Sequence, residues 1–417
     1  MSLSLTLATV RCEPLSRAEA EHLLSRTTLR YSDQDIAELQ GHTLSCYLVS
    51  EMSRSTRSSE LDELLSFLPH QNLTAKKIYE SLLGEERATS IIEDEMQRAR
   101  LIRGLLSEEQ LREVMTDFWF NHFNADPDKG TVVACNVGSL ERDLRDNAFG
   151  KFRTLLGLAV KNPAVLENLD NSVSQGHAVN ENFGRELMEL YTTGRVYTQR
   201  DVVELSRAFS GWSHNDNPEA SDYLEFRFYP ALHGRGNREI LGRNFEEDEQ
   251  EMILDMLSSH PATAEFLSRK LLVRFLCDEP DEQLVSRIAQ VYLESDGDIA
   301  TVLQGIFQSR EFFDPAVRGA KFKSPLEFIV AAIDASKDRV HAAQDIATNS
   351  EWTQMLIGHW NRMGSPYTTP NPLGWPDQRS TWTSGVGLRE RRNLARNLSA
   401  QREELLSRLL GEEFQSR

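Results

Sequence analysis

The sequence predicts an all-α protein, a multi-helix globular bundle that carries a small β-hairpin insertion and a Pro/Trp-rich loop near the C-terminus. Three observations lead to this prediction. Apolar residues recur at helical spacing through most of the 417 residues, and cap-forming residues precede many of these segments. Residues 222–242 instead alternate like a strand and then become rich in glycine. Residues 368–382 hold three of the 14 prolines and two of the six tryptophans.

The whole chain, residues 1–417, is expected to form one large helical domain, because a helical chain of this length can bury one continuous core. Within it we expect peripheral N-terminal helices in residues 1–105 and a central helical core in residues 106–345. The Trp/Pro loop and a C-terminal helix would occupy residues 346–417.

The overall charge predicts that the protein does not bind nucleic acid. The chain has 46 Lys and Arg against 64 Asp and Glu, a formal net charge of −18, which repels nucleic-acid phosphate. The four cysteines are scattered, with no Cys-x-x-Cys pair, so neither a disulfide framework nor a zinc knuckle is expected.

We predict a cytoplasmic location, with export to a periplasm as the alternative. Residues 1–10 lack the charged start and the apolar core of a secretory signal. No later apolar run approaches the roughly 20 residues that cross a bilayer, so no membrane span is expected.

The N-terminal third predicts short helices joined by polar loops. Ser16 would cap a helix over residues 17–24, and Ser32 would cap one over residues 33–40. Residues 50–59 are polar and predict a loop. Further helices are expected over residues 61–68 and 74–106.

The next helix ends in a group of candidate functional residues. Ser107 and Gln110 match a capping box, which predicts the start of this helix. The helix runs through an aromatic segment typical of a core and ends near Asn121 and His122. A histidine flanked by asparagines at the end of a buried helix is either a functional group or a hydrogen-bonded structural residue.

Residues 136–169 predict a helix pair broken at 147–150, followed by a short helix that begins at Pro163. A loop then carries Asp170, Asn171 and His177 toward the next helix. Functional groups tend to lie on loops that are held by rigid helices, so these side chains are candidates for a site.

Residues 180–212 concentrate more polar side chains than any other segment. They predict two helices. The first is capped by Asn180 or the residue before it and ended by Gly194 in the left-handed region, and the second is capped by Thr198 with Asp201 as its capping-box partner. One face of the first helix carries Glu181, Asn182, Arg185, Glu186 and Glu189.

Two interpretations of this polar face remain open. It is either a solvated face with i, i+4 ion pairs of about 0.2–0.5 kcal/mol each, or the wall of a cleft. In a cleft, Arg185 would hold an anionic group and a carboxylate would act as acid, base or metal ligand. Asn180 and Asn182 favour the cleft, because asparagine is a poor helix former.

The second half predicts more helices around an insertion. His233 lies in the Gly-rich part of the insertion, whose glycines fit neither a phosphate-binding loop nor a dinucleotide site, so no cofactor is assigned. Trp375 in the late loop is a candidate for stacking on a substrate ring. The final helix, 388–410, would pack on the bundle or on a partner protein. The other helices are expected over residues 247–258, 261–277, 281–293, 299–308 and 326–335.

Several segments together resemble an uncharacterised bacterial family labelled domain of unknown function eighteen-hundred. The resemblance runs in order from about residue 110 to the end, with two departures. The turn at residues 194–197 is shorter than usual in the family, and after His233 the expected acidic and lysine positions read Gly234 and Arg238-Glu239. It implies an all-helical bacterial protein and brings no established activity. The matching segments are residues 118–124 (FWFNHFN), 169–171 (LDN), 180–190 (NENFGRELMEL), 197–202 (YTQRDV), 211–212 (GW), 323–325 (KSP) and 374–377 (GWPD).

These observations support three functional hypotheses. The first is a hydrolase or transferase that acts on a polar, carbohydrate-like substrate in a cleft, and the second is a non-catalytic helical adaptor or assembly protein whose polar cluster is structural. The third is a metal site formed by His122 or His177 with nearby carboxylates. For the enzyme, the catalytic candidates are Glu181, Glu186 and His122, and the substrate-binding candidates are Asn121, Asn180, Asn182, Arg185, Asp170, Asn171, His233 and Trp375.

Overall fold

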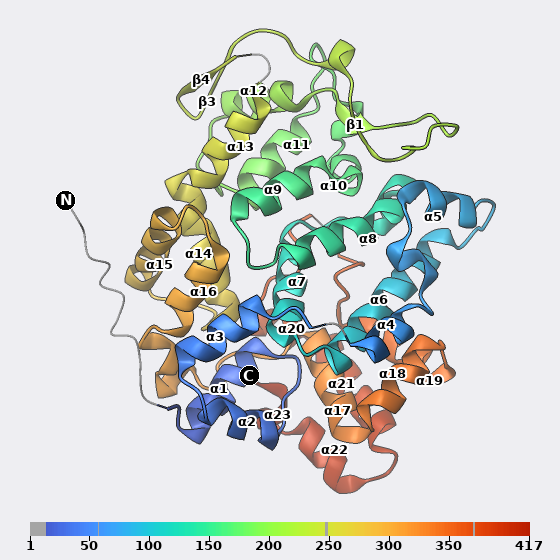
Figure 1. Ribbon diagram of the computed structural model, residues 1–417, viewed down its shortest axis with the longest axis vertical. Coiled ribbons are helices and arrows are strands. Elements are labelled where there is room, and N and C mark those ends of the chain that lie inside the picture. Colours follow the sequence, from blue (N-terminus) through green and yellow to red (C-terminus); the bar gives the residue numbers. More distant parts are fainter. Residues whose placement is uncertain (1–13, 57, 247–248, 370–371) are drawn as a thin grey trace.

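The computed structural model describes residues 14–56, 58–246, 249–369 and 372–417. Helices make up most of these residues, and the strands among them form two small antiparallel sheets (Figure 1). The predicted all-α class with a small β insertion is therefore confirmed. Residues 1–10, on which the expected lack of a signal rests, lie outside the described residues.

The N-terminal helices are α1 (Arg17–Thr27), α2 (Asp33–Gln40), α3 (Leu44–Ser53), α4 (Ser59–Leu65), α5 (Ala75–Ser81) and α6 (Ala88–Leu106). Ser16 and Ser32 cap α1 and α2 as expected, and each forms a complete capping box that was not predicted. The prediction of a loop from residue 50 was wrong at its start, because residues 50–53 form the last turn of α3. Leu48 and Met52 of α3 are buried, and their packing holds this polar segment in a helix.

Helix α7 (Gln110–His122) begins later than the sequence predicted. The Ser107 hydroxyl accepts the N–H of Glu109 at 3.0 Å instead of capping the helix. The buried Gln110 amide bonds to the carbonyl of Gly104 and accepts the N–H of Leu29, so it cannot complete a capping box. The expected helices that follow are α8 (Thr131–Asp146), α9 (Phe152–Lys161) and α10 (Pro163–Asn168).

The polar segment forms α11 (Glu181–Glu186), which continues as a π-helix, η4 (Leu187–Tyr191), and then α12 (Gln199–Phe209). Asn180 caps α11, Thr198 forms its capping box with Asp201, and Gly194 has a φ of +63°, all as predicted. The π-helix was not expected. Its wider turn is closed by side chains, since the Thr192 hydroxyl donates to the Leu187 carbonyl at 2.7 Å.

The insertion after α12 contains two sheets of two strands each. Strand β1 (Trp212–His214) pairs with β2 (Phe226–Phe228), so that Trp212 faces Phe228 across the ladder. Strand β3 (Arg238–Ile240) pairs with β4 (Arg243–Phe245). These sheets lie on the outside of the helices at one end of the molecule (Figure 1).

The C-terminal half contains α13 (Gln250–Ser259), α14 (Pro261–Phe275), α15 (Glu282–Glu294), α16 (Ile299–Phe307), α17 (Pro325–Ser336), α18 (Arg339–Ala347), α19 (Glu351–Met363), α20 (Arg379–Trp382), α21 (Gly385–Ser399), α22 (Glu403–Leu410) and α23 (Glu412–Gln415). Short 3₁₀ helices connect the elements: η1 (Pro69–Asn72), η2 (Pro127–Lys129), η3 (Asn171–Val173), η5 (Pro230–Leu232), η6 (Glu311–Phe313) and η7 (Pro315–Val317).

Three parts of this half differ from the sequence prediction. Helices α18 and α19 were not predicted. Helix α20 lies in the Trp/Pro segment that was expected to contain no helix, and it begins only after the last proline. The single helix predicted over residues 388–410 is two helices, because Ala400 and Gln401 have φ values of +44° and +70° and reverse the chain.

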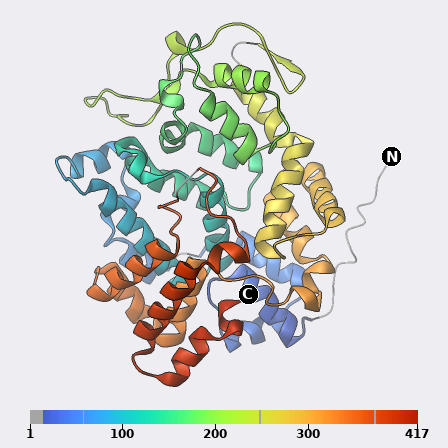
Figure 2. The ribbon, with the colours of Figure 1, turned by 180° about the vertical axis from the view of Figure 1, so that it is seen from behind.

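The buried core runs from Leu15 to Leu409 and joins helices from both ends of the chain. Helix α6 packs against α17 and α18, so blue and orange helices lie side by side in Figure 1. The Trp/Pro loop before α20 runs through the middle of the molecule, between α7 and α14 (Figure 2). Within the described ranges, no helix combines the length and the apolar character that crossing a membrane requires.

Candidate functional site

The polar face of α11 lies at the surface. Arg185 Nη2 and Glu181 Oε2 are 3.1 Å apart, and their side chains are 37% and 39% exposed. The Gln199 amide donates to the same Glu181 oxygen at 2.6 Å. This is the i, i+4 pair of a solvated helix face. Glu186 is half-buried beside it, and burial raises its pKa, with the neighbouring Glu189 raising it further.

The asparagines of this region bind backbone groups. The Asn180 side chain accepts the N–H of Asn182 at 2.9 Å, which caps α11. The Asn182 amide donates to the Asp170 carboxylate and to the Leu169 carbonyl, at 3.3 Å each. The buried Asn171 amide donates to the Phe209 and Trp212 carbonyls, and thereby holds the end of α12 to β1. Together these contacts stabilise the loop between α10 and α11.

His233 lies at the C-terminal end of α12. Its Nδ1 lies 2.9 Å from the Ser210 carbonyl, and its ring packs edge-on against Phe228. His233 is buried, whereas His177 is exposed. Neither residue lies in the cavity described next.

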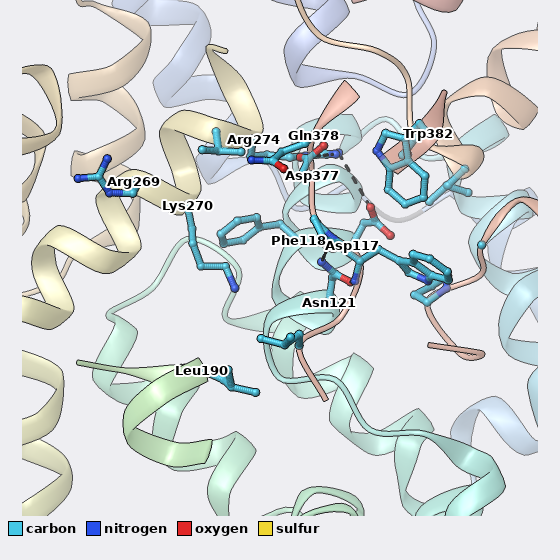
Figure 3. Close-up of a pocket in the computed structure, with 18 of the residues that line it drawn as sticks. Asp117, Phe118, Asn121, Leu190, Arg269, Lys270, Arg274, Asp377, Gln378 and Trp382 are labelled. Carbon is cyan, nitrogen blue, oxygen red and sulfur yellow. Dashed lines mark hydrogen bonds and ion pairs between the residues drawn. The ribbon is translucent and has the colours of Figure 1, made fainter. Parts of the chain in front are cut away.

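A cavity of about 550 Å³ lies between α7, the π-helix, α14 and the Trp/Pro loop (Figure 3). Its wall is mainly apolar and aromatic. Of the expected site residues, Asn121 and Trp375 line it. The lining consists of Asp117, Phe118, Asn121, Glu189, Leu190, Gly194, Arg195, Phe266, Arg269, Lys270, Val273, Arg274, Ser324, Pro325, Leu326, Trp360, Gly364, Pro366, Leu373, Trp375, Pro376, Asp377, Gln378 and Trp382.

Asn121 fixes the Trp/Pro loop against α7. Its amide nitrogen donates to the Trp375 carbonyl at 2.8 Å, and its oxygen accepts the Trp375 N–H at 2.7 Å. The Trp375 indole N–H in turn donates to the Ser365 carbonyl. Gly374 has a φ of +68°, and a Cβ there would overlap the Asn121 backbone oxygen. The loop can therefore approach α7 only with glycine at this position.

Lys270 of α14 directs its amine into the cavity, toward the space between Asn121 and Leu190 (Figure 3). Phe266, Lys270 and Arg274 follow each other at four-residue spacing, which places all three on the cavity face of α14. Lys270 forms no ion pair with any carboxylate in the described part of the chain. Burial lowers its pKa to about 8.

His122 lies behind Lys270 rather than in the cavity wall. It is 2% exposed and is packed among aromatic rings that include Phe118 and Tyr191. Its Nε2 lies 3.2 Å from the Tyr191 carbonyl, and its Nδ1 lies 2.9 Å from Lys270 Nζ. A carbonyl can only accept, so Nε2 carries the proton and Nδ1 accepts from Lys270.

The protonation state of His122 agrees with this arrangement. Burial lowers the pKa of His122 well below its usual value, and the neighbouring Lys270 cation lowers it further. The imidazole is therefore neutral near pH 7. It uses one hydrogen of the Lys270 amine and leaves the others directed at the cavity.

Arg274, one turn after Lys270, has the opposite surroundings. Its guanidinium contacts Glu327 at 3.0 Å and Asp377 at 3.2 Å, with Asp117 at 4.0 Å. Burial alone would lower the pKa of Arg274, but these carboxylates raise it above its usual value. Arg100 pairs with Asp117 at 2.7 Å on the other side. The charges of this wall are thus neutralised within the protein.

The sequence did not single out Lys270, Arg274 or Glu327. The available signal was a lysine that recurs with Phe266 and Arg274 at i, i+4 spacing on an otherwise apolar helix. That spacing places the three residues on one face but leaves open whether the face meets a cavity. The start of α17, Trp360 of α19 and the Trp/Pro loop, about 100 residues later, complete the wall.

One group of carboxylates in the described ranges is close enough to share a metal ion: Glu93, Asp126 and Asp128. It contains neither His122 nor His177, and it lies outside the cavity lining. The metal site that the sequence predicted at His122 or His177 therefore stays a prediction. Among the described residues, neither histidine lies close to a second and a third metal-binding side chain.

The cavity offers an aromatic surface and one cationic or nucleophilic amine. Arg195, Leu373 and Gln378 are exposed and mark its mouth, whereas Lys270 lies farther in. Such a site can enclose an apolar ligand and bind an oxygen-bearing group through the amine.

Comparisons with known proteins place the chain in a family. Searches of curated proteins and of solved structures gave no match to this chain. The model of a family described as protein of unknown function (DUF1800) matches residues 22–417, which include every residue of the cavity wall. The match covers most of the chain, and the protein belongs to this family of unknown function.

Proposed function

We propose that the protein binds a small ligand in the cavity beside Lys270. The ligand has an aromatic or otherwise apolar body and presents a carboxylate or carbonyl oxygen to the amine. The apolar body of the ligand would pack against the aromatic wall of the cavity, which includes Phe118, Phe266 and Trp375.

One observation carries the proposal: Lys270 faces an apolar cavity without a carboxylate partner in the described chain. Burying an unpaired ammonium is costly, and an ordinary structural lysine reaches water or an anion instead. An anionic or strongly polar oxygen from a ligand would compensate this cost. The neighbouring Arg274 has its own carboxylates and does not compete for the ligand.

Binding of 2-naphthoate and of the neutral 2-naphthalenemethanol tests the proposal. At pH 7 we expect the wild-type protein to bind the carboxylate at least about tenfold more tightly, since a charge-assisted hydrogen bond contributes about 1.5–3 kcal/mol. Lys270→Met should remove this preference and retain the binding of the alcohol. Isothermal titration calorimetry measures both affinities.

Glu181→Gln serves as the matched control, because Glu181 lies on the surface of α11 and outside the cavity lining. This variant should bind both compounds as the wild type does. Equal affinities of wild type and Lys270→Met for the carboxylate would contradict the proposal, and so would failure of both compounds to bind.

The hydrolase or transferase reaction expected from the sequence stays a prediction. Its catalytic candidates Glu181 and Glu186 lie on α11, and His122 reaches the cavity through Lys270. Glu189, one turn after Arg185, does line the cavity, where its carboxylate accepts from the Tyr197 hydroxyl at 2.6 Å. The mainly aromatic interior of the cavity favours an aromatic ligand over a carbohydrate-like substrate, which could use only the polar residues at the mouth.

The adaptor hypothesis and the protein partner at the C-terminal helix also remain predictions. Leu394, Leu398 and Leu409 are buried within the chain itself, against α17 and α19. Leu388 stays exposed at the start of α21. A partner would therefore find only part of the expected apolar face.

A further inference from the structure

The Lys270 amine is held in one orientation from behind. The π-helix turns the Tyr191 carbonyl toward His122, and this contact places the proton on Nε2. The unprotonated Nδ1 then faces Lys270 at 2.9 Å. A neutral amine can donate one hydrogen to Nδ1 and direct its lone pair elsewhere, and the side open to it is the cavity.

The surroundings of the amine favour its neutral form. Only the Phe266 ring, whose centroid lies 5.5 Å from Nζ, contacts the ammonium form as a cation–π partner, and no carboxylate in the described chain pairs with it. Burial therefore lowers the pKa of Lys270 to about 8. At pH 7 about one Lys270 in ten would then be uncharged, against fewer than about one in a thousand for a lysine with the usual pKa of about 10.4. Lowering of this kind activates amine nucleophiles.

We propose that Lys270 captures aldehyde or ketone ligands of aromatic character as an imine, an inference that rests on the proposed binding function and specifies its ligand. The Nζ lone pair attacks the carbonyl carbon, and the carbonyl electron pair moves to the oxygen, which takes up a proton. Loss of this oxygen as water then gives the C=N bond. The balance is one amine and one carbonyl giving one imine and one water, with no change of oxidation state.

The architecture suits this chemistry in two respects. The apolar wall limits the access of water, which disfavours hydrolysis of the imine. The Asn121 amide, drawn near Lys270 in Figure 3, is held in a fixed orientation by the Trp375 backbone, to which its nitrogen donates and from which its oxygen accepts. His122 is a positioning residue in this scheme, because it contacts the amine and not the ligand.

Reductive trapping tests the proposal on the full chain. The protein is incubated at pH 7 with 2-naphthaldehyde and sodium cyanoborohydride, which reduces an imine to a stable secondary amine. Peptide mass spectrometry then measures the rate of modification at each lysine. We expect Lys270 to react at least about tenfold faster than the exposed Lys77, and an excess of 2-naphthoate to suppress the reaction at Lys270 alone.

The outcomes separate the two proposals. The Lys270→Met variant should still be modified slowly at Lys77 and should lack the fast modification that we expect at Lys270. If 2-naphthoate binds to the wild type but Lys270 reacts no faster than Lys77, imine capture is overturned and the binding function stands. If 2-naphthoate does not bind and Lys270 is not trapped, both proposals are overturned.

Discussion

At the scale of single residues, Lys270 and Arg274 show how surroundings decide the role of a buried cation. They lie one helical turn apart on the same face of α14. Arg274 has carboxylates from α7, α17 and the Trp/Pro loop around it, whereas Lys270 has an imidazole and aromatic rings. The first arrangement stabilises a fixed charge, and the second leaves an amine that can respond to a ligand.

The pH dependence of stability should reveal Lys270. Its folded pKa of about 8 lies below the unfolded value of about 10.4, so protonation favours the unfolded chain. The resulting destabilisation is complete below pH 8 and disappears as the pH rises through 10.4. We therefore expect Lys270→Met to be more stable than wild type at pH 7, with the difference shrinking by pH 10.

Urea unfolding at both pH values measures this difference. Lys161→Met is the control, because Lys161 is 42% exposed and is paired with Glu251. A Lys270→Met variant that is less stable than wild type at pH 7 would show that the amine already has a stabilising partner.

Glu181→Gln should leave stability almost unchanged. The Glu181–Arg185 pair is exposed, and such pairs contribute about 0–1 kcal/mol. Thermal unfolding should therefore shift by less than about 2 °C, a shift typical of a small surface effect. A loss of several kcal/mol would assign Glu181 to the structural framework. Loss of an enzymatic activity at unchanged stability would support the catalytic role that the sequence suggested.

At the scale of elements, the Trp/Pro loop depends on one close backbone approach. Gly374 combines a left-handed φ of +68° with contact to the Asn121 backbone and side chain. The two hydrogen bonds between Asn121 and Trp375 form directly next to it. The loop is thereby fixed to the end of α7, where it closes one side of the cavity.

Gly374→Ala should release this loop. The strained φ costs about 1–3 kcal/mol, and the clash with Asn121 adds to it. We expect a lower thermal midpoint and weaker binding of 2-naphthoate. The tryptophan emission should also change, because the ring centroids of Trp375 and Trp382 lie 5.9 Å apart in this region.

Gly242→Ala is the matched control for this variant. Gly242 has a similar φ of +74°, but no atom lies within 4 Å of the position that its Cβ would take. It should lose stability through backbone strain alone and bind the ligand normally. Equal effects of both substitutions on ligand binding would argue against the loop as part of the site.

At the scale of the whole molecule, a buried network of charges joins segments that are distant in the sequence. Arg100 of α6 pairs with Asp117 of α7, and Arg274 of α14 contacts three carboxylates, those of Asp117, Glu327 of α17 and Asp377 of the Trp/Pro loop. Removing one member of such a network leaves an uncompensated buried charge. The network therefore fixes the relative positions of the cavity walls.

Acid should weaken the protein through Asp377. Burial would raise the pKa of Asp377, but Arg274 and Arg417 outweigh this effect and hold it at about 2. Because the unfolded value is about 3.9, the carboxylate contributes about 2–3 kcal/mol of stability above pH 4. This contribution is lost as the pH falls through 2.

Asp377→Asn should be less stable at pH 7 by about 3–5 kcal/mol and should lose this part of the acid dependence. Urea unfolding between pH 2 and pH 7 measures both effects. Asp255→Asn is the control, since Asp255 is 64% exposed and should change little. An unchanged acid profile in Asp377→Asn would remove Asp377 from the stabilising network.

The sequence by itself determined most of the helices and several of their caps. Caps and turns such as Asn180, Thr198 and Gly194 act within a few residues, so a local pattern is sufficient to predict them. It also showed that Asn121, His122 and Trp375 were unusual. It did not predict the π-helix or the break at Ala400. It also missed α18 and α19, although Asp338 and Ser350 cap these helices by the same local rule.

Only the tertiary structure decided which polar groups share a cavity. Polar residues recur at helical spacing on one face of α11 and on one face of α14, yet the face of α11 is exposed to solvent and the face of α14 lines the cavity. The difference is made by a loop that returns about 100 residues later and by the π-helix that turns a carbonyl to His122. Burial is a property of the assembled chain, because it depends on what covers a residue, and the spacing along one helix does not encode that cover.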